Sequence, residues 1–145
     1  MAWGQGNMSA SPLNMARAYS IIANQGKFKT TRYLLDEEST QEEIIDRVYA
    51  GILRENLVYT ANNHDGLTFP TFAGKTGTAE HDVDRTVFSR KLKNDAWYVF
   101  VVHSPRLNTE LAVALRIEKT IQRSGEARNW MRDMVVPILR ELEYM

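Results

Sequence analysis

The longest uninterrupted apolar stretch in this chain runs from Ala96 to Val102 and reads AWYVFVV. A helix that crosses a bilayer needs about 20 apolar residues, so this stretch is far too short to span a membrane. Its β-branched and aromatic side chains instead favour a β-strand, which we expect over Trp97–His103. A further strand is expected over Leu111–Glu118, and the short connection 104–108 fits an antiparallel hairpin.

A third strand is predicted over Thr71–Ala79, on the amino-terminal side of the other two. Gly74 and Gly77 weaken its intrinsic preference for the extended state. Glycine inside a strand often marks a place where another backbone or a ligand comes close. The strand is therefore a candidate for contact with a ligand.

Three helices complete the prediction. Ser11-Pro12 is typical of a helix start and Asn24-Gln25-Gly26 of a helix end, so the first helix should cover about Pro12 to Asn24. A second should begin at a capping box formed by Thr40 and Glu43 and end near Asn56, followed by a loop over 59–70. Its apolar stripe would consist of Ile44, Ile45, Val48, Tyr49, Ile52 and Leu53.

The last helix should run from about Gly125 onward, with a kink or a broken turn at Pro137. Trp130, Met131 and Met134, which lie at helical spacing in it, are interpreted as core. The order of two helices, three consecutive antiparallel strands and a closing helix indicates an α+β fold, with helices packed on a small sheet. The length of 145 residues suits one compact domain.

Composition excludes several classes of function. The chain has 18 basic and 18 acidic residues, so a global electrostatic case for binding nucleic acid is missing. It has no cysteine, which rules out disulfides and thiolate metal sites. His64, His81 and His103 show no ligand spacing, so we expect neither a metal site nor a cofactor.

Two charged segments and a tryptophan are weaker candidates. Glu80, His81, Asp82 and Asp84 could form an acidic rim, but a solvated loop is the better interpretation. The run 83–95 is a weak basic patch that is better read as a solvated connection between strands; its cations are Arg85, Arg90, Lys91 and Lys93. The sequence leaves open whether Trp3 is buried or exposed.

The sharpest chemical signal is Lys75-Thr76-Gly77-Thr78. A cation, two hydroxyls and an unobstructed backbone on one strand can hold a carboxylate, since each charge-assisted hydrogen bond contributes about 1.5–3 kcal/mol. Free N–H groups of such a strand can also donate to a developing oxyanion. The alternative, from these four residues alone, is an ordinary strand with an exposed lysine.

The surrounding residues resemble penicillin-binding transpeptidases. The segment 4–19, GQGNMSASPLNMARAY, is similar to their GQG…TPLQMA…Y helix start, with Ser11 and Asn14 as mild departures. The segment 23–26, ANQG, resembles their helix end, and 73–80, AGKTGTAE, their third shared motif. The segment 96–100 and the ending VPIL at 136–139 also match, so the resemblance covers nearly the whole chain, in the right order.

The resemblance implies a role for each residue of the motif. Lys75 would supply positive charge beside the nucleophile and the substrate carboxylate, and Thr76 and Thr78 would offer hydroxyls to that carboxylate. The Thr78 N–H would form half of an oxyanion hole, and Gly77 would keep the cleft open. Lys75 and Thr78 point to opposite faces of an ideal strand, so both serve one cleft only if the strand twists or lies at the sheet edge.

No serine of the chain fits S-x-x-K, the motif that holds the family's nucleophilic serine, or S-x-N, the family's second motif. The resemblance therefore implies that residues 1–145 are the carboxyl-terminal part of a class B type transpeptidase domain, inactive alone, with the upstream half of the domain as partner. The parent would bind stem peptides and β-lactams outside a cytoplasmic membrane that anchors it. A β-lactamase, a β-lactam sensor and a non-catalytic structural fragment remain as alternatives, and surface exposed by truncation would favour self-association.

Overall fold

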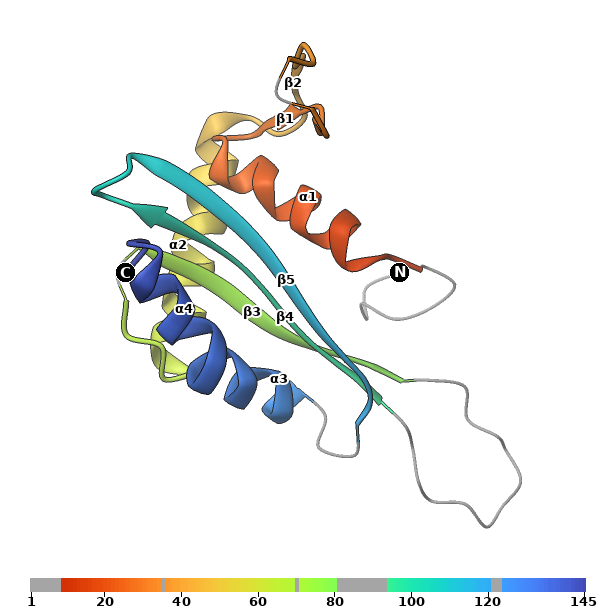
Figure 1. The fold of residues 1–145 in the computed structure, drawn as a ribbon, viewed down its shortest axis with the longest axis vertical. Helices are drawn as coiled ribbons and strands as arrows, with labels where there is room; N and C mark the ends of the chain where they lie inside the picture. Colours follow the sequence, from red (N-terminus) through yellow and green to blue (C-terminus); the bar gives the residue numbers. More distant parts are fainter. Residues whose placement is uncertain (1–8, 35, 70, 81–93, 121–123) are drawn as a thin grey trace.

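The computed structural model describes residues 9–34, 36–69, 71–80, 94–120 and 124–145 (Figure 1). At its centre is a three-stranded antiparallel sheet in the order β3-β4-β5, formed by Phe72–Glu80, Asn94–Ser104 and Thr109–Thr120. Helices cover both faces of this sheet. The predicted α+β fold with a sheet of about three strands is therefore confirmed.

The two hairpin strands are longer than the sequence predicted. Residues 105–108 form the turn between β4 and β5, and the register joins Ser104 to Thr109 and Val99 to Ala114. Asn94 and Asp95, predicted to belong to a solvated connection, lie in β4 and are buried. The apolar run at 96–102 is buried almost completely, because β4 is the central strand and side chains from both faces of it enter a core.

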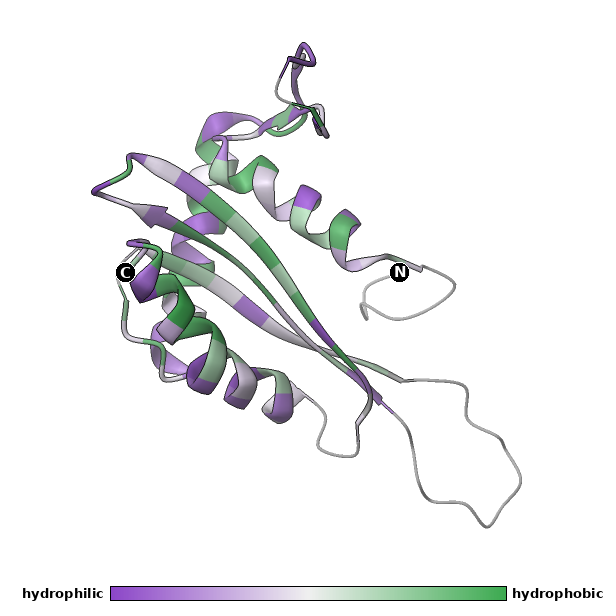
Figure 2. Cartoon of the chain, viewed as in Figure 1, coloured by the Kyte–Doolittle hydropathy of each residue, from purple (hydrophilic) through white to green (hydrophobic). Residues whose placement is uncertain are grey.

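One core lies on each side of the sheet. The larger contains Phe72, Tyr98 and Phe100, with the Phe72 and Phe100 rings stacked at 4.6 Å, and it is closed by the carboxyl-terminal helices through Met131 and Leu139. The smaller lies under α1 (Pro12–Ala23). Figure 2 shows apolar residues on the sheet and on the helix surfaces that face it.

Helix α1 begins and ends as predicted. The Ser11 side chain accepts a hydrogen bond from the Asn14 N–H at 3.2 Å, and Pro12 occupies the first turn. Gln25 and Gly26 have φ of 58° and 94°, which turns the chain out of the helix. A Cβ on Gly26 would lie 1.9 Å from the Ile45 carbonyl oxygen, so glycine is required there by space as well as by φ.

The predicted capping box of the second helix is wrong. Residues Gln41–Glu43 form a short strand, β2, paired antiparallel with β1 (Lys27–Lys29), and neither strand was predicted. Helix α2 spans Arg47–Asn63, and Asp46 caps it by accepting from the Val48 N–H at 2.7 Å. The helix continues past the predicted end near Asn56 and takes in the first residues of the predicted 59–70 loop.

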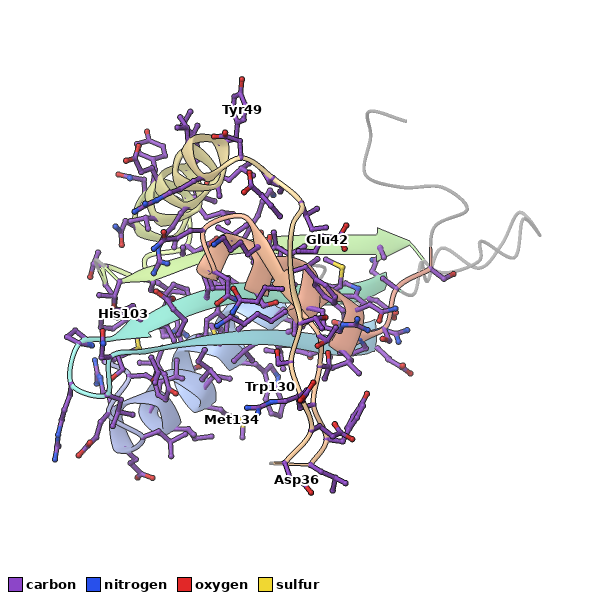
Figure 3. The ribbon with its side chains drawn as sticks, turned by 90° about the horizontal axis from the view of Figure 1, so that it is seen from above. Asp36, Glu42, Tyr49, His103, Trp130 and Met134 are labelled. Carbon is purple, nitrogen blue, oxygen red and sulfur yellow. The ribbon has the colours of Figure 1, made fainter. Side chains whose placement is uncertain are left out.

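The apolar stripe predicted for the second helix is largely exposed. Val48 and Tyr49 are 68% and 65% exposed, and Figure 3 shows Tyr49 projecting outward from the helix. The small residues Ala50 and Ala61 are buried instead, where α2 runs along β3. The apolar residues on the outer side of α2 have no covering element among the residues that the structure describes.

The closing helix is interrupted, as Pro137 predicted. α3 (Ser124–Trp130) passes into the π-helical turn η1 (Met131–Val135) and then α4 (Val136–Glu141). The Val136 N–H donates to the Met131 carbonyl, an i→i−5 bond that brings the proline into the helix without a clash. Met131 is buried, but Trp130 and Met134 lie on the side away from the sheet and are about half exposed (Figure 3), so their assignment to the core is wrong.

Candidate active site

A cleft of about 330 Å³ opens between α1 and the sheet, at the Lys75-Thr76-Gly77-Thr78 strand. α1 supplies one wall, and β3 and β4 supply the other. All four residues of the predicted motif line this single cleft. Its other lining residues are Ala10, Met15, Tyr19, Ala79, Trp97 and Val99.

Lys75 lies on the face of β3 that looks toward α1. It is cross-strand partner to Val99, and its neighbour on the same face, Ala73, is buried in the core beneath α1. The Lys75 Nζ donates to the Thr76 carbonyl at 3.2 Å and, among the described residues, makes no ion pair. An exposed ammonium without a carboxylate at the mouth of a cleft is available to an anionic ligand.

β3 lies at the edge of the sheet, with β4 as its one strand neighbour in the described part of the chain. In an antiparallel pair, alternate residues of an edge strand direct their N–H and C=O groups away from the partner. The edge position is the one that the sequence required for Lys75 and Thr78 to serve one cleft. Whether the N–H groups of this strand hold an oxyanion stays a prediction.

The Thr78 hydroxyl has a second contact that the sequence did not reveal. Its Oγ1 accepts a hydrogen bond from the Ser124 N–H at 3.1 Å, which links β3 to the first residue of α3. The hydroxyl can still donate its own proton while it accepts this bond. Thr78 thus ties the closing helix to the strand that lines the cleft.

The two glycines of the strand meet different surroundings. A Cβ on Gly74 would lie 2.7 Å from Tyr98 Cε1 and 2.8 Å from Phe100 Cβ, so this glycine makes room for the aromatic core. A Cβ on Gly77 would meet only Trp97 Cβ, at 3.5 Å. Packing of the core therefore requires glycine at position 74. It does not require glycine at position 77, which we assign to the cleft.

Two aromatic residues of the cleft were not singled out by the sequence. Tyr19, the last residue of the segment 4–19 that resembles the family's helix start, lines the cleft, and burial raises the pKa of its hydroxyl. The Arg116 guanidinium lies 5.4 Å from the centre of the Trp97 ring and bonds Asp95 through Nε at 2.8 Å. Two features of the sequence could have pointed to these residues. Tyr19 lies at the end of a family-like segment, and Trp97 lies in the strand that follows the motif strand.

The other sequence candidates do not gather at this cleft. His103 lies at the far end of β4, with Nδ1 3.3 Å from Glu110 Oε1, and His64 packs edge-on against Tyr59. No group of three potential metal ligands occurs in the described ranges, and none of their helices is long and apolar enough to cross a membrane. Trp3, the GQG residues and the charged candidates His81, Asp82, Asp84, Arg85, Arg90, Lys91 and Lys93 lie outside the described residues, as does the Glu80 side chain.

Comparison with known sequences places this geometry in a family. A family model described as the penicillin binding protein transpeptidase domain matches residues 1–135. Penicillin-binding protein 2a of Streptococcus pneumoniae is 26% identical over 114 residues, and penicillin-binding protein 3 of Bacillus subtilis is 25% identical over 133 residues. The matches cover 68% and 85% of this chain but only 15% and 19% of those proteins.

Solved structures share the fold. The transpeptidase domain of Burkholderia pseudomallei penicillin-binding protein 3 has a TM-score of 0.67 and 23% identity, over 94% of this chain and 44% of that one. The Mycobacterium tuberculosis protein PBPA has a TM-score of 0.65 and 25% identity, over 94% of this chain and 32% of that one. The chain thus spans less than half of the relatives it matches.

Proposed function

Because this chain belongs to the penicillin-binding protein transpeptidase domain family, we propose that it supplies the Lys75 strand of a peptidoglycan D,D-transpeptidase. The observation that carries the proposal is the unpaired Lys75 ammonium on an open strand edge, in a cleft that the rest of the motif also lines. The relatives are named for penicillin binding and the family model for a transpeptidase domain, and the Lys75 ammonium suits a ligand that carries a carboxylate.

Each motif residue has a task in this proposal. Lys75 attracts the carboxylate of a stem peptide or a β-lactam, and the hydroxyls of Thr76 and Thr78 donate to it. The Thr78 N–H contributes to the oxyanion hole, where the loss of one donor costs about 2.7–4 kcal/mol of transition-state stabilisation. Gly77 keeps the strand open, since folding places no demand on its missing side chain.

The nucleophile comes from another part of the domain. The chain has no S-x-x-K and no S-x-N, so we propose that residues 1–145 act together with an upstream half that provides the serine and its base. The serine would attack the peptide carbonyl of a D-Ala-D-Ala stem and expel the last D-alanine. An amine acceptor would then take the acyl group from the serine.

Uncovered apolar surface supports such a partner. On the outer side of α2 and on the closing helix, several large apolar residues are about half exposed or more, and no described element covers them. Surfaces of this kind mark contacts with another chain or domain. The same proposal places the assembled domain outside the cytoplasmic membrane, on a parent anchored in it.

The test is acylation by a fluorescent penicillin. Residues 1–145 alone should not label, and labelling should appear when they follow an upstream half that carries the two missing motifs. Lys75→Ala should then reduce the rate of labelling by about tenfold or more, the equivalent of a lost charge-assisted hydrogen bond. Arg106→Ala, which removes an exposed cation in the turn between β4 and β5, away from the cleft, is the matched control.

Two results would contradict the proposal. Labelling of Lys75→Ala at the unmodified rate would remove the role given to the lysine. Labelling of residues 1–145 alone would show that the serine lies within them. Turnover separates the family's other activities, because rapid deacylation indicates a β-lactamase and a long-lived adduct indicates a transpeptidase or a sensor.

A further inference from the structure

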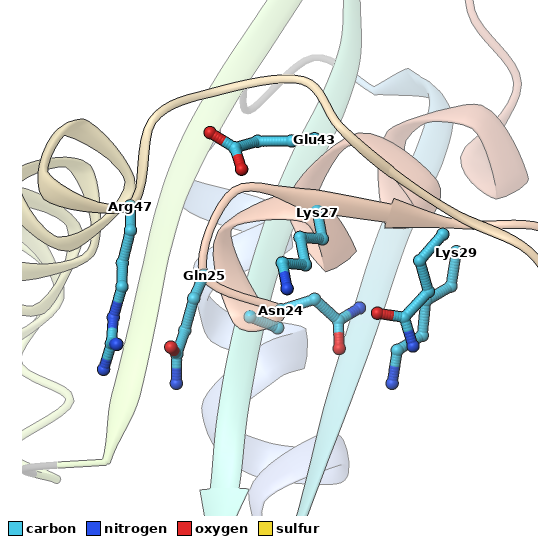
Figure 4. A pocket seen from close by; sticks show the side chains of 8 residues that line it. Asn24, Gln25, Lys27, Lys29, Glu43 and Arg47 are labelled. Carbon is cyan, nitrogen blue, oxygen red and sulfur yellow. The ribbon is translucent and has the colours of Figure 1, made fainter.

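A second cavity lies away from the Lys75 cleft, where the end of α1, the β1–β2 hairpin and the start of α2 meet (Figure 4). Its volume is about 470 Å³, larger than that of the cleft. We call it the hairpin groove, and it is lined by Ala23, Asn24, Gln25, Lys27, Lys29, Gln41, Glu43 and Arg47. Of the segments that resemble the family, the helix end at 23–26 contributes to the lining, and the motif of the Lys75 strand does not.

The backbone holds the basic residues of the groove on one side. Lys27 and Lys29 share a face of β1, and Phe28, on the opposite face, lies 5.0 Å beneath the Arg17 guanidinium. The Gly26 carbonyl accepts from the Ile44 and Ile45 N–H groups at 3.0 and 3.1 Å, which fixes the return strand against the end of α1. The groove is therefore built from three elements whose relative positions are set by backbone hydrogen bonds.

The groove has an excess of positive charge. Lys27, Lys29 and Arg47 outnumber the one carboxylate, Glu43, in a chain whose total charge is zero. None of the three cations makes an ion pair within the described residues, although Glu43 is the cross-strand partner of Lys27. Figure 4 shows their nitrogen atoms beside the amides of Asn24 and Gln25, with the Glu43 carboxylate apart from them.

We propose that the hairpin groove binds a multivalent phosphate, a ligand with two or more phosphate groups in succession. Residues two apart on a strand are separated by roughly 6.6 Å, so the Lys27 and Lys29 ammoniums suit neighbouring phosphates better than one small anion. The Arg47 guanidinium can donate two parallel hydrogen bonds to phosphate oxygens, and the side-chain amides of Asn24 and Gln25 add neutral donors. This binding is independent of the activity proposed for the Lys75 cleft.

The test is calorimetric titration of the chain with tripolyphosphate, inorganic phosphate and citrate. Tripolyphosphate should bind about tenfold or more tightly than either of the others, because it alone places several phosphates along the groove. The double variant Lys27→Gln, Lys29→Gln should weaken tripolyphosphate binding by about tenfold or more. It should also make tripolyphosphate binding less dependent on salt concentration, because two cationic contacts are lost.

The matched control removes two positive charges elsewhere. Arg106 and Arg132 are exposed and each already faces a carboxylate, that of Glu143 and that of Asp133, so Arg106→Gln, Arg132→Gln should leave tripolyphosphate binding within about twofold. Glu43→Gln should tighten it severalfold. Arg47→Gln, on a different element, repeats the test if the hairpin variant unfolds on heating at a lower temperature than the parent.

Vesicles identify the source of the phosphate. Sedimentation with phosphatidylcholine vesicles that contain a long-chain isoprenyl diphosphate, but not with phosphatidylcholine vesicles alone, would assign the groove to lipid head groups with successive phosphates if the Lys27→Gln, Lys29→Gln variant loses it. Tripolyphosphate binding without sedimentation would assign the groove to a soluble ligand. Equal loss in the Arg106, Arg132 control would overturn the proposal. So would equal affinity for citrate and tripolyphosphate, or unchanged binding in the hairpin variant.

Discussion

Gly74 and Gly77 lie three residues apart on the strand of the candidate site, and a side chain has different consequences at each. Gly74→Ala should destabilise the fold by about 1–3 kcal/mol, because the new methyl group would overlap Tyr98 and Phe100 in the core. Gly77→Ala should change the free energy of unfolding by less than about 0.5 kcal/mol, because its Cβ meets only ordinary contact with Trp97. Urea unfolding of the two variants measures both values.

The same pair separates folding from function. In the assembled domain, Gly77→Ala should slow acylation by penicillin although it folds normally, while any loss in Gly74→Ala should follow its stability. A Gly77→Ala chain that unfolds as easily as Gly74→Ala would contradict the assignment of Gly77 to the cleft.

Tyr98 makes the stability of the chain depend on pH. Its buried hydroxyl donates to Asp65 Oδ2 at 2.8 Å, and burial, with further contributions from this bond and from the Asp65 charge, raises its pKa well above 10. The neutral phenol is thus favoured in the folded state. Its contribution is complete below about pH 10, the pKa of an unfolded tyrosine, and is lost as the pH rises beyond that value.

Denaturant unfolding between pH 8 and pH 11 tests this expectation. Stability should fall above pH 10 by up to about 1.4 kcal/mol per pH unit for Tyr98, and the buried Tyr19, whose pKa is also raised, acts in the same direction. Tyr98→Phe should lower stability at pH 7 by about 1–3 kcal/mol and flatten the fall at high pH. A variant with the same alkaline slope as the parent would show that Tyr98 is not the responsible group.

For single residues, the sequence located the candidate site but not all of its contacts. The motif spacing placed Lys75 and Thr78 on one strand, and the sheet edge that their joint use requires is present. The bond from the Ser124 N–H to the Thr78 hydroxyl joins residues 46 positions apart. Spacing along the chain carries no information on such a contact.

Among the elements, the start of α2 shows where local signals mislead. Thr40 and Glu43 have the residue types and spacing of a capping box, yet β2 occupies this stretch and pairs with β1. The Gly26 carbonyl binds the Ile44 and Ile45 N–H groups, so a nonlocal contact delays the helix until Asp46. By contrast, the ends of α1 and the interruption at Pro137 follow from local covalent geometry, and the sequence predicted both.

Substitution of the two candidate caps tests which one starts α2. Asp46→Ala should destabilise the chain by about 1 kcal/mol, because the Val48 N–H loses its acceptor. Thr40→Ala should cost less, since the Thr40 side chain caps no helix and its own N–H bonds to Thr30 Oγ1. Thermal unfolding monitored by circular dichroism compares the two, and a larger loss for Thr40→Ala would indicate that the helix starts at the earlier box.

On the scale of the whole molecule, the distribution of exposed apolar residues separates two outer surfaces. One is the outer side of α2 with Val48, Tyr49 and Ile52, and the other is the row at four-residue spacing along the closing helix, formed by Trp130, Met134, Ile138 and Leu142. The sequence identified these residues as helical stripes, which they are, and assigned Trp130 and Met134 among them to the core. Whether an apolar stripe is buried depends on which elements pack against the helix, and helical periodicity does not specify those elements.

Without the proposed upstream half, these surfaces should bring copies of the chain together. We expect light scattering after size exclusion to give a mass above 16.6 kDa that rises with concentration, because burial of apolar surface contributes roughly 25 cal/mol per Å². Met134→Glu with Ile138→Glu should shift the chain toward the monomer, since both side chains are exposed and the charges would be buried on association. Val48→Glu with Ile52→Glu tests the α2 surface separately.

A chain that stays monomeric at every concentration would contradict self-association. Loss of penicillin labelling in the assembled domain on either pair of substitutions would locate the contact with the upstream half.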